Sequence, residues 1–98
     1  FDKGCLAYIF SSDPDGIAQQ ISDVLSRGIT FLNGIGWYTK NSEKIIMCVV
    51  KKSEIYQLKH IAKTVDPKSF IIIGETTETI GLGFKENISG DAFEQKKK

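Results

Sequence analysis

Six consecutive apolar residues lie at the centre of the segment from Lys44 to Lys52, and they constrain the fold more than any other feature of the sequence. The run Ile45-Ile46-Met47-Cys48-Val49-Val50 has no polar position, so we expect a strand that is covered on both faces. It is far shorter than the ~20 apolar residues that a membrane-spanning helix needs. The sequence therefore predicts a central strand in a sheet with two apolar faces.

Periodic patterns on either side of this run predict the other elements. Strands are expected near 5–11, 29–39, 44–52 and 69–75, and amphipathic helices near 14–27 and 54–65. The order strand, helix, strand, strand, helix, strand is typical of the α+β ferredoxin-like βαββαβ sandwich. In that fold a four-stranded antiparallel sheet carries two helices on one face, as in the PII and ACT domains.

Particular residues predict where the helices begin and end. Asp13 is expected to cap the first helix with Pro14 at its first position, and Ser53 to cap the second, which Asp66-Pro67 then ends. Gly28 is expected to supply a left-handed cap at the end of the first helix, with Arg27 in the last turn. Further expectations are an apolar face on the first helix that includes Val24, and a bulge or bend at Gly34 and Gly36.

The length of 98 residues suits one domain. We expect that domain to occupy residues 1–84 and the polar tail, 85–98, to be partly disordered. Since the chain begins at Phe1, without an initiating Met or a targeting signal, it is expected to be a piece of a longer protein.

The strands should leave one face of the sheet apolar and bare, since both helices lie on the other face. Burying such a patch yields about 25 cal/mol per Å², so we expect a homo-oligomer with Tyr8, Met47 or Ile72 in the interface. The alternative is that the tail, Ile80 to Phe93, folds back over this face within one chain.

Charge and residue types argue against several classes of function. Without the three C-terminal lysines, acidic residues outnumber basic ones, which argues against nucleic-acid binding. Cys5 and Cys48 lie in apolar runs and are expected to be buried thiols, and His60 is expected to be a surface histidine. No catalytic set, metal-ligand cluster or cofactor motif is visible, so we expect no enzyme activity, no metal and no cofactor.

Five ordered motifs together resemble one known family. They are Arg27-Gly28-Ile29-Thr30, Gly34-Ile35-Gly36-Trp37-Tyr38-Thr39, Met47-Cys48-Val49-Val50, Asp66-Pro67 with Phe70, and Ile80-Gly81-Leu82-Gly83-Phe84. This set resembles the C-terminal cytoplasmic domain of the YitT family of bacterial membrane proteins, a domain of unknown function. The resemblance implies an attached N-terminal transmembrane domain and a place at the cytoplasmic face of the bacterial cell membrane.

The glycine-rich loop is the best candidate for a ligand site. Its glycines let a ligand approach the backbone, and its aromatic and hydroxyl side chains offer stacking and hydrogen bonds. The candidate ligand-binding residues are Arg27, Thr30, Gly34, Gly36, Trp37, Tyr38, Thr39, Gly81, Gly83 and Phe84. Two alternatives stay open: the glycines only permit turns while the aromatic residues pack, and Arg27 only completes a helix end.

The leading hypothesis is a non-catalytic, self-associating module that senses a small ligand and regulates the attached membrane domain, which is a possible transporter. The alternative is a purely structural oligomerisation domain with no metabolite ligand.

Overall fold

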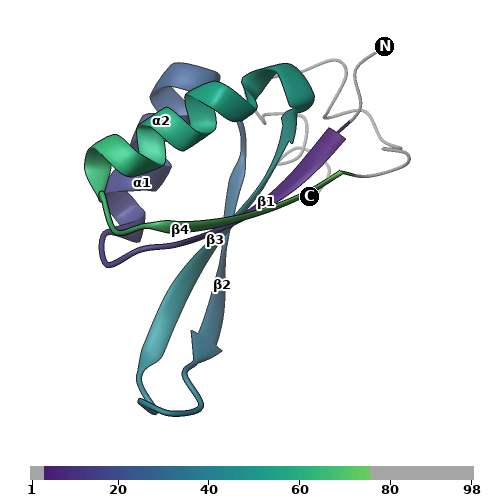
Figure 1. The fold of residues 1–98 in the computed structure, drawn as a ribbon. Helices are drawn as coiled ribbons and strands as arrows, with labels where there is room; N and C mark the ends of the chain where they lie inside the picture. The colour runs from purple at the N-terminus through teal and green to yellow at the C-terminus, as the bar shows by residue number, and fades with distance from the viewer. Residues whose placement is uncertain (1–3, 76–98) are drawn as a thin grey trace, which may run out of the picture.

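The computed structural model describes residues 4–75, which form one sheet and one helical layer (Figure 1). The elements are β1 (Gly4–Phe10), α1 (Pro14–Gln20), the π-helical turn η1 (Ile21–Leu25), β2 (Ile29–Ile35), β3 (Ser42–Lys51), the 3₁₀ turn η2 (Lys52–Glu54), α2 (Ile55–Val65) and β4 (Phe70–Glu75). None of the helices in this part of the chain is long and apolar enough to cross a membrane.

The four strands form an antiparallel sheet in the order β2-β3-β1-β4, and both helices cover the same face (Figure 1). This is the α+β ferredoxin-like arrangement, so the predicted fold class is confirmed. The apolar run of β3 lies between β1 and β2, at an inner position of the sheet. The helices and strands begin and end within a few residues of the predicted positions.

The core lies between the sheet and the helices. Alternate residues of β1 and β3 point into it, where Ile9, Ile46 and Val50 meet Ile17 and Leu58 with no exposed surface. The remaining core residues are Cys5, Ala7, Ile21, Leu25, Cys48, Ile61 and Ala62. Both cysteines are therefore buried free thiols, as predicted.

The start of the first helix is confirmed, and its end differs from the prediction. Asp13 accepts a hydrogen bond from the Gly16 N–H at 3.0 Å, and Pro14 is the first helical residue. The helix continues as the π-helical turn η1 and stops at Ser26, which adopts the left-handed conformation with φ 55°. The left-handed cap is thus Ser26 and not Gly28, and the helix ends two residues earlier than predicted, at Leu25.

The predicted cap of the second helix is wrong. Ser53 lies inside η2 and gives no cap hydrogen bond at the start of α2. Instead, the carboxylate Oε1 of Glu54 accepts the Lys51 N–H at 2.8 Å. The end of α2 at Asp66 is confirmed.

The β2–β3 hairpin extends beyond the other two strands (Figure 1), because β1 pairs with β3 only as far as Ile46. Its register is regular from Ile29 opposite Cys48 to Ile35 opposite Ser42, so the predicted bulge is absent from β2. The strand also ends four residues earlier than predicted, at Ile35. Residues 36–41 form the turn, which two backbone hydrogen bonds between Gly36, Lys40 and Asn41 close.

Candidate functional site

The face of the sheet opposite the helices is apolar across three strands. Tyr8 of β1 pairs with Met47 on one side and with Ile72 on the other, so the structure brings the three predicted interface residues into one row. We call this surface the bare face because neither helix of residues 4–75 covers it, and its remaining large apolar side chains are Leu6, Phe10, Leu32, Ile45, Val49 and Phe70. They are half-buried or exposed, and Phe70 and Ile72 are 60% and 46% exposed.

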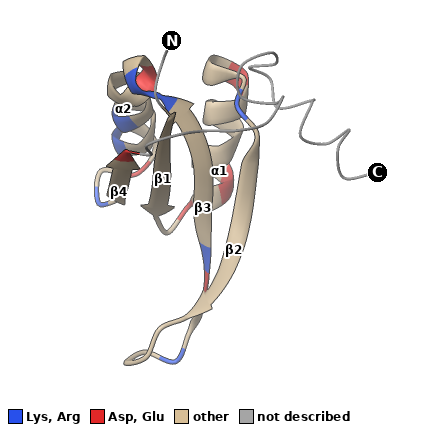
Figure 2. Ribbon diagram, turned by 90° about the vertical axis from the view of Figure 1, so that its right-hand side faces the viewer, with Lys and Arg blue, Asp and Glu red and all other residues tan. Residues whose placement is uncertain are grey.

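Charged residues are sparse along the strands and occur near their ends (Figure 2). On the bare face of β3, Glu43 precedes the apolar positions 45, 47 and 49, and Lys51 follows them. This face therefore has an apolar centre with one negative and one positive end.

The glycine-rich loop divides between β2 and the turn. Gly34 lies in β2, whereas Trp37 and Tyr38 lie at the tip of the hairpin and are 82% and 88% exposed. A Cβ atom on Gly36 would lie 2.5 Å from Thr39 Oγ1, which accepts the Asn41 N–H at 3.3 Å. A side chain at Gly36 would thus displace the Thr39 hydroxyl, which caps the turn.

Arg27 lies away from this loop, in a buried ion pair. Its side chain is 3% exposed, and its Nε donates to Glu54 Oε1 at 3.0 Å. Burial first, and the Glu54 charge second, raise the pKa of the nearby Cys48 thiol to about 12, although the Arg27 charge partly opposes both. Arg27 therefore joins the end of the first helix to the start of the second, rather than completing a last helical turn.

The remaining candidate ligand residues are also dispersed. Thr30 is exposed on β2 beside Met47, so it belongs to the bare sheet face. Gly81, Gly83 and Phe84, like the tail 85–98, lie outside the described residues. The structure thus brings Gly34, Gly36, Trp37, Tyr38 and Thr39 together at the end of the β2–β3 hairpin. It places Thr30 at the other end of β2 and Arg27 outside the hairpin.

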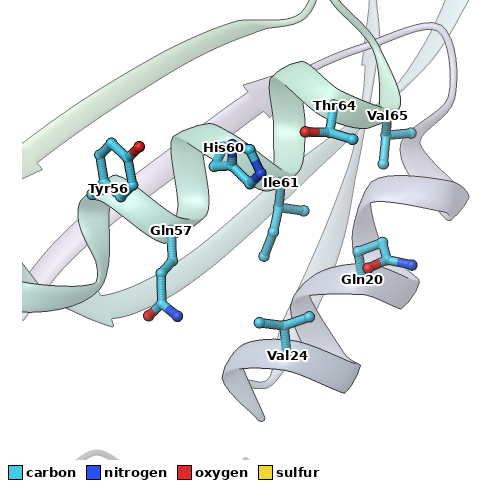
Figure 3. A pocket seen from close by; sticks show the side chains of 8 residues that line it. All are labelled: Gln20, Val24, Tyr56, Gln57, His60, Ile61, Thr64 and Val65. Atoms are coloured by element: carbon cyan, nitrogen blue, oxygen red, sulfur yellow. The ribbon is translucent and has the colours of Figure 1, made fainter.

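Sequence reasoning missed a groove between the two helices (Figure 3). It encloses about 420 Å³, and residues of α1, η1 and α2 line it: Gln20, Val24, Tyr56, Gln57, His60, Ile61, Thr64 and Val65. None of these side chains is a carboxylate or a lysine, and the rings of Tyr56 and His60 stack at 6.5 Å. Val24 is 52% exposed here, which contradicts its predicted place on the buried face of the first helix. The i, i+4 spacing of residues 56, 60 and 64 on α2 was the signal available in the sequence.

Asp66 fixes the loop between β1 and α1. Its carboxylate accepts hydrogen bonds from the Ser11 hydroxyl at 2.7 Å and from the backbone N–H groups of Ser12 and Lys68. These bonds, that from Ser11 first, hold the pKa of Asp66 below its usual value of 3.8. Among residues 4–75, no three His, Cys, Asp or Glu side chains form a group that could hold a metal ion.

Known proteins resemble this chain in sequence and in fold. Residues 27–81 match a family described as "Uncharacterized protein conserved in bacteria (DUF2179)". The chain is 32% identical over 85 residues to the UPF0750 membrane protein YvjA of Bacillus subtilis and 34% identical over 80 residues to YitT of the same organism. These alignments cover 87% and 82% of this chain, but only 30% and 29% of the two relatives.

A solved structure confirms the fold. The crystal structure of an uncharacterized DUF2179 protein from Eubacterium ventriosum superimposes with a TM-score of 0.67 at 33% sequence identity. The match covers 74% of this chain and all of that one. The resemblance to the YitT family is confirmed, and the chain belongs to the DUF2179 family of bacterial proteins.

Proposed function

We propose that this domain is a non-catalytic, self-associating regulatory module of a bacterial integral membrane protein, located on the cytoplasmic side. The observation that carries the proposal is the bare apolar face of the sheet around Tyr8, Met47 and Ile72. Leaving such a face in water forgoes about 25 cal/mol for each Å² that association would bury. Relatives named membrane proteins support the attachment, since the chain spans about 30% of YvjA.

The charge pattern favours a second copy of the same chain as the partner. When two copies pack face to face around a two-fold axis with their β3 strands antiparallel, Glu43 of one copy lies near Lys51 of the other. The same packing puts the apolar centres, including Met47, in contact. The face is thus complementary to itself in both polarity and charge.

The regulatory half of the proposal needs a ligand, and the helix groove is the better-formed site for one. Its volume of about 420 Å³ falls in the usual range for small-molecule pockets, and it combines apolar walls with side-chain amides at Gln20 and Gln57. The hairpin tip, by contrast, presents Trp37 and Tyr38 to solvent. An uncharged ligand fits the groove, since no carboxylate or lysine lines it.

Light scattering tests self-association. The wild-type chain should be a dimer or higher oligomer, and Met47→Asp should convert it to a monomer by placing a charge in the apolar centre. Ser53→Asp is the control, because it adds the same charge to an exposed residue outside this face. Reversing Glu43 to Lys should weaken association, and adding Lys51→Glu should restore it. A wild-type monomer at high micromolar concentration, with residues 85–98 present and deleted, would contradict the proposal.

A thermal-shift panel of nucleotides, amino acids, anions and uncharged compounds such as nucleosides tests the regulatory role. A ligand that binds only the folded state raises the melting temperature by mass action. A shift that Gln57→Leu removes would locate the ligand in the helix groove, and one that Gly36→Val or Tyr38→Phe removes would locate it in the hairpin. Melting that no compound changes, in a protein that self-associates, would favour the purely structural alternative.

A further inference from the structure

The tip of the β2–β3 hairpin exposes three large apolar or aromatic side chains within four residues. Ile35, Trp37 and Tyr38 are 74%, 82% and 88% exposed. Single exposed apolar residues are common on protein surfaces, but a cluster of this kind at the end of a projecting element marks an interaction site. Figures 1 and 2 show this tip at the far end of the molecule from α2.

The turn does not require the aromatic residues. Backbone hydrogen bonds close it, from the Gly36 N–H to Asn41 O at 3.0 Å and from the Lys40 N–H to Gly36 O at 2.9 Å. The left-handed residue is Lys40, with φ 63°. Apart from the Lys40 ammonium 5.1 Å from its ring centroid, Trp37 is surrounded by solvent. Its large apolar surface is therefore available to a partner.

Charge helps to identify that partner. Lys40 and Glu43 carry opposite charges, and the Lys44 ammonium is 3.0 Å from an oxygen of Asp15. The tip is thus close to neutral, which does not suit a polyanion such as nucleic acid. Trp and Tyr are the residues that proteins concentrate at the boundary between lipid headgroups and acyl chains, and a neighbouring lysine extends its charge into the water.

We propose that the hairpin tip, through Ile35, Trp37 and Tyr38, inserts into the headgroup region of the membrane to which the domain is attached. The inference rests on the proposed function for that attachment. Insertion of the tip would fix the orientation of the domain relative to the bilayer. The bare sheet face does not include Ile35, Trp37 or Tyr38, so a second copy could still bind it. Because the antiparallel pairing proposed above places the two tips at opposite ends of the dimer, one copy of the pair would insert its tip.

Trp37 reports directly on this insertion, because it is the only tryptophan in the sequence. Adding phosphatidylcholine vesicles in excess should move its emission to shorter wavelength, and brominated phosphatidylcholine should quench it. Equal mixtures of phosphatidylcholine and phosphatidylglycerol should bind with similar strength, and added salt should change little, since the tip has little net charge. Emission that stays unchanged at saturating lipid, without quenching, would overturn the proposal.

Two variants keep the Trp37 fluorophore and remove one of the other two side chains that contact the lipid. Tyr38→Ser and Ile35→Ser should each weaken the partition into vesicles about tenfold, as expected when an interaction of ~1.4 kcal/mol is lost. Tyr56→Ser is the matched control, because Tyr56 is 79% exposed on α2, away from the tip, and its loss should leave partition unchanged. Equal effects of Tyr56→Ser and Tyr38→Ser would contradict a specific role for the tip.

The monomeric Met47→Asp variant separates this inference from self-association. It should bind vesicles through its intact hairpin, so a failure of dimerisation and a failure of lipid binding are observed independently. A shift in Trp37 emission that follows protein concentration without lipid, and that vesicles do not increase, would instead assign the tip to contacts between copies and refute the membrane proposal.

Discussion

Removing the charge of Glu54 should destabilise the domain through the buried Arg27 guanidinium. Glu54→Gln keeps the shape of the side chain and an oxygen that can accept the Lys51 N–H, but it removes the negative charge that lies beside the Arg27 guanidinium. Breaking a buried ion pair by removing one partner costs about 3–5 kcal/mol. Since the Glu54 side chain is 16% exposed and the amide still accepts hydrogen bonds, we expect the lower end, about 3 kcal/mol.

The opposite substitution should cost less. Arg27→Met keeps much of the apolar stem and leaves the partly exposed Glu54 with its bond from the Lys51 N–H, so we expect a loss of about 1–2 kcal/mol. The double variant should be no less stable than Arg27→Met alone, because the glutamate charge has no role once the guanidinium is absent. The coupling energy between the two sites should therefore be about 3 kcal/mol, which is the whole loss that Glu54→Gln causes alone.

Urea unfolding, followed by circular dichroism at one protein concentration, measures the free energy of unfolding of the wild type, the two single variants and the double variant. With a slope of about 1 kcal/mol/M, the urea midpoint of Glu54→Gln should fall by roughly 3 M. Additive losses for Arg27→Met and Glu54→Gln, or a loss under about 1 kcal/mol for Glu54→Gln, would refute the assignment of Arg27 to a structural ion pair. Arg27 would then return as a candidate for ligand binding.

Three further outcomes follow from local geometry. Because the pKa of Cys48 is raised to about 12, its thiol should resist alkylation at pH 8 until the protein unfolds. The free energy of unfolding should also decline as the pH rises above 9.0, the ordinary pKa of the thiol, because only the unfolded form then ionises. Because the pKa of Asp66 is lowered, its ionised carboxylate stabilises the folded state above pH 3.8, and this stabilisation is lost as the pH falls through the folded-state pKa. Asp66→Asn should therefore lower the melting temperature at neutral pH and make little difference in strong acid. Gly36→Ala should cost about 1 kcal/mol by displacing the Thr39 hydroxyl, and less in a Thr39→Ala background, as chemical unfolding would show.

The candidate site was only partly accessible from the sequence. The sequence could identify Tyr8, Met47 and Ile72 as residues of one sheet face, because alternate residues of a strand share a face. The strand register confirms that they form one row. The helix groove could not, because it depends on how α1 and α2 pack and on the π-helical turn that exposes Val24. The role of Arg27 was also inaccessible, since its partner Glu54 lies 27 residues away in the sequence.

The sequence by itself determined the order of the strands and helices, the apolar core and the two apolar faces of the sheet, because these depend on local periodicity and on burial. Only the tertiary structure decided how the polar groups are used. It pairs Arg27 with Glu54, assigns the left-handed cap to Ser26, and places Trp37 in a turn instead of a strand. These features depend on the partners that folding brings together from distant parts of the chain, which local periodicity does not specify.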